Sequence, residues 1–282
     1  MWRGRRHRRL RLAALAASAA MVAACGGTGP DDDLGYDVTA DTISDETTQD
    51  IEVFAPDAHG AWPVVVAYHG NEGNAGQMAL LAEGVASAGA VVFVPNYRSG
   101  DFSQQGIVNL ARDAECGYRY ARTVAPDYGG DLAEPVVWVG WSLGAVFALQ
   151  AGLDETLDDT GKILTCFSDA PRPDIIVAVS GCYEDIGPAF DPAQWGNEDA
   201  EVILVDGDED TVCPAAQTDR VAKELRTRHY DVRLVTIEGA DHFAPVFHRY
   251  EDGQMVESPD EPAGQEVQRL VTDAVTGKVT GG

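Results

Sequence analysis

Short apolar runs alternate with longer helical stretches from about residue 51 onward in this 282-residue chain. Residues 63–68 read Pro-Val-Val-Val-Ala-Tyr, and residues 90–95 and 135–140 have the same Val-rich character. Strands that are apolar at every position are typical of parallel sheets, because crossover helices bury both faces of such a sheet. The sequence therefore predicts an α/β fold: a mainly parallel, twisted sheet of about eight strands with helices on both faces.

The predicted strands and helices follow one another in the alternating order of βαβ units. The predicted strands span residues 51–54, 63–68, 90–95, 135–140, 174–180, 201–206 and 231–237. The predicted helices span residues 75–88, 107–124, 143–152, 215–229 and 262–275. Functional groups of open α/β sheets gather at the carboxyl ends of the strands, so we expect them in the turns that follow these strands.

The first 24 residues have the character of an export signal. Six arginines lie between Arg3 and Arg11, and residues 12–24 carry no charge. This uncharged run is shorter than the roughly 20 residues that a membrane-spanning helix needs, but it suits the apolar region of a signal peptide. The Arg5-Arg6 pair leaves both the general secretory route and twin-arginine export open.

The signal ends in Val22-Ala23-Ala24-Cys25, which resembles a bacterial lipobox. The resemblance implies that Cys25 is diacylated on its sulfur and becomes the N-terminus. The protein would then be anchored at the outer face of the bacterial cytoplasmic membrane. The alternative is an ordinary small-residue cleavage site with an incidental cysteine, which would give a secreted protein.

Residues 25–50 are rich in Gly, Asp and Thr and poor in large apolar side chains. Such a segment buries too little surface to offset its ordering entropy, so we expect a flexible acidic tether. The expected organisation is a signal peptide at 1–24, a tether at 25–50 and an α/β domain at 51–282.

The net charge narrows the choice of partners. The formal net charge is −26, and removal of six arginines with the leader leaves −32 (−26 − 6). A surface this acidic repels nucleic acid and other polyanions. We therefore expect no nucleic-acid partner and neutral substrates, while the oligomeric state stays open.

The residues Gly140-Trp141-Ser142-Leu143-Gly144 stand where a predicted strand ends and a predicted helix begins. A serine on such a sharp turn takes strained backbone angles, and the flanking glycines avoid clashes with the neighbouring strand and helix. The turn presents the hydroxyl beside the N–H groups of a helix N-terminus. The motif predicts Ser142 as a nucleophile; an ordinary glycine-rich turn is the alternative.

A serine nucleophile needs a general base, and the base needs an acid that orients it. His242 follows the last predicted strand in a short turn, whereas His229 lies at a helix end and His248 lies six residues beyond His242. His242 is therefore the predicted base.

The turn after strand 201–206 holds the candidates for the acid. Asp210 is preferred because it comes before an apolar residue and a proline that can begin the next helix, and Asp208 is the runner-up. Glu184 or Asp185, after the preceding strand, is a further alternative.

No metal and no organic cofactor are expected. A calcium-binding EF-hand loop that starts at Asp206 would need Gly at its sixth position and Glu at its twelfth, where the chain has Thr211 and Gln217. The cysteines show no C-x-x-C spacing, so a zinc site is poorly supported.

An oxyanion hole needs a second backbone donor besides the residue after the nucleophile. Residues 69–73 read His-Gly-Asn-Glu-Gly and follow strand 63–68. The predicted donors are the N–H groups of Asn71 and Leu143. His69 precedes the nucleophile in the chain and is expected to brace this turn instead of acting as the base.

Over residues 50–275 the chain resembles the α/β-hydrolase superfamily. The resemblance rests on the His69 turn, the residues Asn-Tyr-Arg at 96–98, the Ser142 elbow, and the turns that end at Asp210 and His242. It is most similar to dienelactone-hydrolase-like and carboxylesterase-like members, which implies a Ser-His-Asp triad, an acyl-enzyme intermediate and ester substrates. The chain departs from the common pattern with Asn71 in the oxyanion turn, Trp141 in the elbow and a single glycine after it, so the substrate stays open.

Four cysteines remain after Cys25, and an even number in an exported chain favours two disulfides in one of three pairings. Given Asp210 as the acid, Cys213 lies next to it and Cys182 follows the adjacent strand. A Cys182–Cys213 bridge would then hold the acid loop, with Cys116 and Cys166 as the second pair.

Four aromatic residues, Trp141, Tyr183, Trp195 and Phe243, are candidate walls of an apolar substrate pocket, although each suits packing equally well. Only residues 181–200 separate two predicted strands, so any cap over the sheet is minimal. This favours small or extended neutral esters. The expected function is a carboxylesterase-type serine hydrolase; the alternatives are an acyltransferase or peptidase with the same triad, and a non-catalytic surface-binding lipoprotein.

Overall fold

A computed structural model describes residues 34–44, 48–154, 170–184 and 190–277. Four predicted features lie outside these residues: the signal peptide, the lipidation site Cys25, Cys166 of the second bridge, and the alternative acid Asp185. Within the described ranges, no helix is long and apolar enough to cross a membrane.

An eight-stranded sheet forms the centre of the described domain, in the order β1-β2-β4-β3-β5-β6-β7-β8. Its strands are β1 (Tyr36–Ser44), β2 (Thr48–Pro56), β3 (Val64–Tyr68), β4 (Val91–Pro95), β5 (Val136–Trp141), β6 (Ile175–Val179), β7 (Glu201–Gly207) and β8 (Asp231–Ile237). The pairs β1–β2 and β2–β4 are antiparallel, and the strands from β4 to β8 are parallel. The predicted mainly parallel sheet of about eight strands is confirmed.

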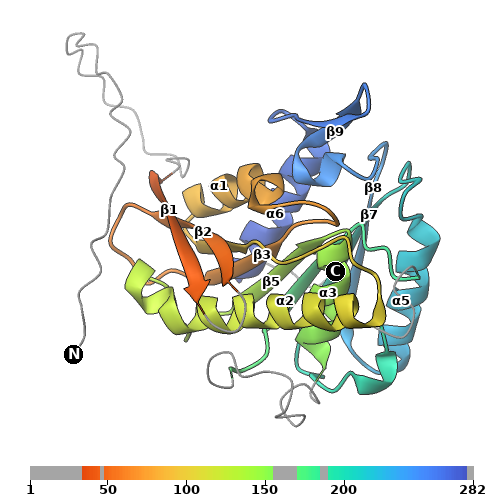
Figure 1. Cartoon of the computed structure of the whole chain (residues 1–282), viewed down its shortest axis with the longest axis horizontal. Coiled ribbons are helices and arrows are strands. Elements are labelled where there is room, and N and C mark those ends of the chain that lie inside the picture. The colour runs from red at the N-terminus through yellow and green to blue at the C-terminus, as the bar shows by residue number, and fades with distance from the viewer. Residues whose placement is uncertain (1–33, 45–47, 155–169, 185–189, 278–282) are drawn as a thin grey trace. The chain divides into compact units, whose positions relative to one another are not determined.

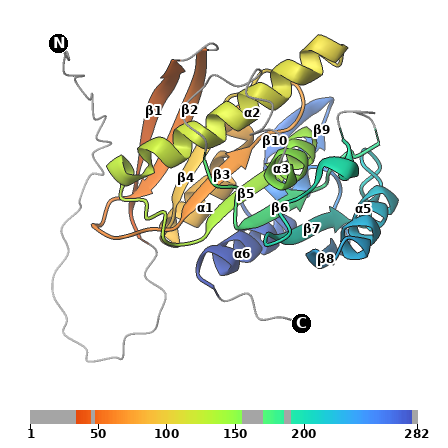
Figure 2. The same ribbon diagram turned by 90° about the horizontal axis from the view of Figure 1, so that it is seen from below.

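Helices cover both faces of this sheet, as Figures 1 and 2 show. The helices α2 (Gln104–Val124), α3 (Leu143–Leu153) and α5 (Ala215–Thr227) pack on one face, and α1 (Ala79–Ser87) and α6 (Pro262–Val275) pack on the other. Along β5, Val136 and Trp138 face the first group, whereas Val137 and Val139 face the second. Burial on both sides explains why these strands are apolar at every position.

The predicted tether boundary at residue 50 is wrong, because the chain enters the sheet at Tyr36. β1 pairs with β2 along its whole length, from Tyr36 opposite Pro56 to Ser44 opposite Thr48. Only Ile43 of β1 has a fully buried apolar side chain, and Val38 is exposed. An edge strand is held mainly by its backbone ladder, so a polar sequence suffices there.

A second sheet, which the sequence did not predict, is the hairpin of β9 (His248–Glu251) and β10 (Gln254–Glu257). Its turn residues Asp252 and Gly253 both have positive φ angles, of 50° and 81°. Asp-Gly is the usual sequence of such a two-residue hairpin turn. This dipeptide was therefore the available sequence signal.

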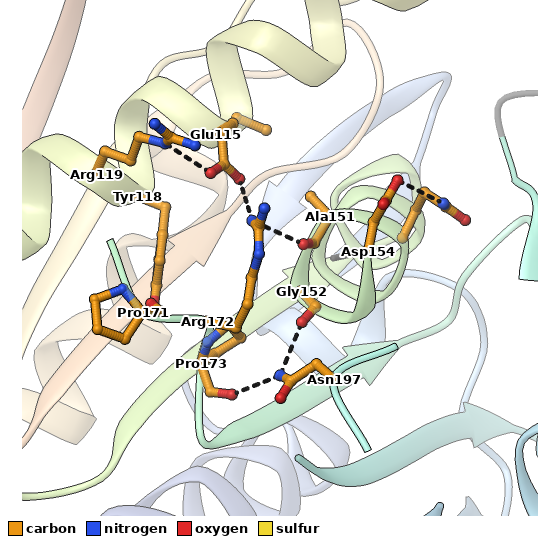
Figure 3. Close-up of polar contacts among 12 residues, drawn as sticks. Glu115, Tyr118, Arg119, Ala151, Gly152, Asp154, Pro171, Arg172, Pro173 and Asn197 are labelled. Atoms are coloured by element: carbon orange, nitrogen blue, oxygen red, sulfur yellow. Dashed lines mark hydrogen bonds and ion pairs between the residues drawn. The ribbon is translucent and has the colours of Figure 1, made fainter. Parts of the chain in front are cut away.

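A buried ion network fixes α2, α3 and the segment before β6 relative to one another (Figure 3). The Glu115 carboxylate on α2 accepts from Arg119 Nε at 2.8 Å and from Arg172 Nη1 at 2.9 Å. Arg172 Nη1 also donates to the Ala151 carbonyl of α3 at 3.1 Å. Asn197 Nδ2 donates to the carbonyls of Gly152 and Pro173, at 3.0 and 3.1 Å. Because α3 starts at the predicted nucleophile turn, this network holds the helix that supports that turn.

Candidate active site

The turn between β5 and α3 holds Ser142 in an unusual conformation, with φ 56° and ψ −117°. A Cβ atom added to Gly140 would lie 2.1 Å from the Gly144 carbonyl oxygen, and one added to Gly144 would lie 2.5 Å from the Tyr68 carbonyl oxygen. Neither position has room for a side chain. The two glycines of the predicted elbow are thus required by close backbone approach, and the strain falls on the serine.

The structure brings Ser142, His242 and Asp210 together in one hydrogen-bonded chain. His242 Nε2 lies 3.0 Å from Ser142 Oγ, and His242 Nδ1 lies 2.8 Å from Asp210 Oδ2. A carboxylate only accepts hydrogen bonds, so Nδ1 carries the proton and Nε2 is left to accept from the serine hydroxyl. All three residues are buried, with 8 % or less of each exposed.

The acid loop orients the second oxygen of Asp210 as well. Asp210 Oδ1 accepts from the backbone N–H groups of Val212 and Cys213, each at 2.8 Å. A Cys182–Cys213 disulfide ties this loop to the segment after β6, as predicted. Both ends of the Asp210 carboxylate are therefore held in place.

The alternative acids lie elsewhere. Asp208 is exposed and accepts from the Gly239 N–H at 2.6 Å. Glu184 is exposed and pairs with Arg220 on α5. The carboxylate that pairs with His242 Nδ1 is that of Asp210.

The two predicted oxyanion donors lie on the turns that follow β5 and β3. Leu143 opens α3, where the first N–H groups have no acceptor within the helix. In the other turn, the Gly70 N–H already donates to Gln77 Oε1 at 3.2 Å, so it is not available to an oxyanion. The next N–H along the chain is that of Asn71, the predicted donor. The Asn71 side chain accepts from the Gly100 N–H at 2.9 Å and so ties this turn to the loop after β4.

His69, the first residue of the turn 69–73 that holds Asn71, is fully buried. Its ring stacks on Tyr97 with centroids 4.2 Å apart, and the Tyr97 hydroxyl donates to the His69 carbonyl at 2.7 Å. Burial lowers the pKa of His69 to about 4, so the ring is neutral at neutral pH. These contacts fit the predicted bracing position.

The four predicted pocket aromatics do not gather around one cavity. Trp141 is buried and donates from Nε1 to the His242 carbonyl at 2.8 Å, so it packs behind the imidazole. Tyr183 and Trp195 line a separate cavity of about 200 Å³ against α5, and no triad residue lines it. Only Phe243 is partly exposed beside His242, with ring centroids 5.3 Å apart.

Two residues that the sequence reasoning did not assign lie next to the predicted site. Gln77 holds the Gly70 N–H, as described above, and Tyr250 on β9 stacks on Phe243 at 5.3 Å and 18°. Neither lies in a motif, and Tyr250 reaches the site through the unpredicted hairpin. Within the described residues, no three His, Cys, Asp or Glu side chains are grouped so that they could hold a metal ion.

No protein-family model and no curated protein sequence matches the chain. Solved structures do. Esterase 2 of Thermogutta terrifontis, phosphoramylated by tabun, superposes with a TM-score of 0.67 at 17 % identity, over 89 % of this chain and 97 % of that one. The propionate-bound form of that esterase gives 0.64 at 18 % identity, over 90 % and 99 %.

A truncated carbohydrate esterase from gut microbiota gives a TM-score of 0.64 at 16 % identity, over 88 % of this chain and all of that one. At identities this low, the superpositions establish the fold alone. The chemistry has to be inferred from the residues of the site. The described domain, with its parallel sheet, its strand-to-helix elbow and its helices on both faces, has the α/β-hydrolase fold.

Proposed function

We propose that this protein is a serine hydrolase that cleaves carboxylic acyl esters. The observation that carries the proposal is the chain of hydrogen bonds from Ser142 Oγ through His242 to Asp210, at a strained turn where α3 begins. A serine with an adjacent oriented imidazole is the arrangement that activates a hydroxyl for acyl transfer.

In the proposed reaction, Ser142 Oγ attacks the ester carbonyl while His242 Nε2 takes the hydroxyl proton. Asp210 holds the protonated imidazole and stabilises its charge. The N–H groups of Leu143 and Asn71 donate to the oxyanion, and His242 then returns the proton to the leaving alcohol. In the second half of the reaction, water attacks the acyl carbonyl while His242 Nε2 takes its proton. The proton then passes to Ser142 Oγ as the carboxylic acid is released.

The solved structures support ester substrates over amides. Those neighbours are named esterases, whereas the phosphorylation of one of them by paraoxon supports only a reactive nucleophile. The acidity of the chain supports neutral esters over anionic ones.

A panel of p-nitrophenyl esters tests the proposal, with matched p-nitroanilides and an added alcohol acceptor. We expect the wild type to hydrolyse short acyl esters faster than anilides and to release mainly free acid, and Ser142→Ala to lose this activity. Equal hydrolysis by both proteins would rule out the proposal. Faster anilide cleavage would favour a peptidase, and acyl transfer to the added alcohol as the main product would favour a transferase.

We further propose that the mature protein is exported and anchored through a lipid on Cys25. The basic leader with its Val-Ala-Ala-Cys end supports this, as does a disulfide at Cys182–Cys213, since such bonds persist in oxidising compartments. In a bacterial host that lipidates proteins, the wild type should fractionate with membranes and Cys25→Ser should not. Equal membrane association of both would contradict the anchor.

A further inference from the structure

The β9–β10 hairpin places an exposed aromatic ring next to the proposed general base. Tyr250 is 58 % exposed, yet one face of its ring stacks on Phe243 at 5.3 Å. Phe243 in turn meets the His242 imidazole edge to face, also at 5.3 Å. The three rings therefore form a continuous aromatic row that runs from the buried imidazole to the exposed ring of Tyr250.

The hairpin is fixed in this position from several sides. The His248 N–H donates to the Phe243 carbonyl at 3.2 Å, and Arg249 Nε pairs with Glu261, the residue before α6, at 2.8 Å. Figure 1 shows the hairpin outside the main sheet, next to α6. These contacts hold the hairpin, and with it Tyr250, in a fixed position beside Phe243.

The same hairpin face also approaches the oxyanion turn. Met255 lies directly opposite Tyr250 in the register, so the two side chains share one face. Gln77 Nε2 lies 4.0 Å from the Met255 sulfur, and Gln77 Oε1 accepts from the Gly70 N–H. The face that carries Tyr250 and Met255 therefore borders the site from the His242 turn to the oxyanion turn.

The chemistry of the proposed reaction decides which half of an ester meets this face. In the acylation step, the protonated imidazole must reach the leaving oxygen within hydrogen-bond distance of Nε2. The alcohol half of the ester therefore lies on the His242 side, while the carbonyl oxygen faces Leu143 and Asn71. Phe243 and Tyr250 extend from that side.

We propose that Phe243 and Tyr250 form the subsite for the alcohol half of the ester, and that it takes a neutral, planar aromatic or ring-bearing alcohol. This inference rests on the proposed esterase function. A planar group can pack against the exposed parts of the Phe243 and Tyr250 rings as these rings pack against each other. The exposed carboxylates of Asp241, Glu251 and Asp252, next to these rings in the chain, disfavour an anionic alcohol.

Two acetate esters with alcohols of similar acidity, benzyl acetate and ethyl acetate, test the subsite. Tyr250→Ala should lower kcat/KM for benzyl acetate roughly three- to tenfold, the usual worth of an aromatic pair, and leave ethyl acetate within about twofold. Tyr250→Phe should keep the wild-type benzyl-to-ethyl ratio. The ratio of benzyl butyrate to benzyl acetate should not change in Tyr250→Ala, because the acyl half lies elsewhere.

Val256→Ala is the matched control, since Val256 is exposed on the other face of the same hairpin, opposite Arg249. Its benzyl-to-ethyl ratio should equal that of the wild type, and thermal melts should show that both variants are folded. An unchanged ratio in Tyr250→Ala, or an equal shift in Val256→Ala, would overturn the subsite while leaving the esterase intact. A wild type that hydrolyses none of these esters would instead overturn the proposed function, and the subsite with it.

Discussion

Both carboxylate oxygens of Asp210 have fixed partners, and this determines the tautomer of His242. Oδ1 accepts from the Val212 and Cys213 N–H groups, and Oδ2 faces His242 Nδ1. Nε2 is then free of a proton and can accept from the Ser142 hydroxyl. Asp210 thus determines which nitrogen of His242 can act as the base, although Asp210 itself does not contact Ser142.

Asp210→Asn tests this arrangement at the scale of single atoms. The amide oxygen must still accept from Val212 and Cys213, so the amide NH2 turns toward His242. Nδ1 would then accept a hydrogen bond, Nε2 would carry the proton, and the serine would lose its base. We expect kcat for a p-nitrophenyl ester to fall roughly 10³- to 10⁴-fold with the fold intact.

Asp208→Asn is the control for that variant, because the exposed Asp208 side chain accepts from the Gly239 N–H and an amide oxygen can do the same. Its kcat should stay near that of the wild type. If Asp208→Asn lost as much activity as Asp210→Asn, the assignment of the acid would fail.

His69 should make stability depend on pH. Burial lowers the pKa of His69 to about 4, whereas an exposed histidine has a pKa of about 6.5. Between these values the unfolded chain binds a proton that the folded chain does not, so the free energy of unfolding falls as pH falls from about 6.5 to about 4. The loss amounts to about 3 kcal/mol at most.

Urea unfolding at pH 7, 5.5 and 4.5 checks this prediction in the wild type and in His69→Gln. The variant should be less stable at pH 7 but should lose less stability toward pH 4.5 than the wild type does. Parallel pH profiles for the two proteins would show that His69 does not titrate in this way.

At the scale of elements, the sequence predicted β3 to β7, which are buried on both faces, and also the partly exposed edge strand β8. β3 to β7 read as continuous apolar runs because α2, α3 and α5 cover one side and α1 and α6 the other. β1 was missed because an edge strand needs few buried side chains. The β9–β10 hairpin was missed because its four-residue strands are largely exposed.

The site residues also divide into those that the sequence could predict and those that it could not. Ser142, Asp210 and His242 were predictable because each follows a strand, and parallel strands bring their carboxyl ends to one edge. Gln77 and Tyr250 were not predictable, because their placement depends on contacts between segments far apart in the chain. Gln77 and Met255, for example, are 178 residues apart.

The Cys182–Cys213 bridge joins the segment after β6 to the acid loop after β7, across a separation of 31 residues. Closing a loop of that length in the unfolded chain is worth about 3–4 kcal/mol in the chain-entropy account. Cys182→Ser and Cys213→Ser should each lower the free energy of unfolding by about this amount. The double variant should lose no more than either single one, as measured by urea unfolding under non-reducing conditions.

Independent, additive losses in the two single variants would contradict a bond between these cysteines. Non-reducing peptide mapping provides the matching control, since it should show the Cys182 and Cys213 peptides linked in the wild type.

For the molecule as a whole, the excess of 46 acidic over 20 basic residues gives the net charge of −26. Like charges repel one another more in the compact state than in the expanded chain, and salt screens this repulsion over about 10 Å at 0.1 M. The charge from which we predict that nucleic acid is repelled should therefore also lower stability at low ionic strength.

Raising NaCl from about 0.02 M to about 0.5 M at pH 7 should therefore raise Tm, by about 2–4 °C for each kcal/mol of relieved repulsion. The same increment at pH 5, nearer the pI of about 4.3, should raise Tm by less, since fewer carboxylates are charged. Circular dichroism melts at both pH values give the comparison. An equal rise at both would show that screening of net charge is not the cause.

Covalent trapping with an organophosphate triester such as paraoxon tests the central claim, that His242 and Asp210 activate Ser142 as a nucleophile. Intact-mass spectrometry of the wild type should show one dialkylphosphoryl group per chain, with peptide mapping placing it on Ser142. Ser142→Ala should take up none, and Asp210→Asn should react far more slowly than the wild type. Phosphorylation at another residue, or equal labelling of wild type and Ser142→Ala, would contradict the account.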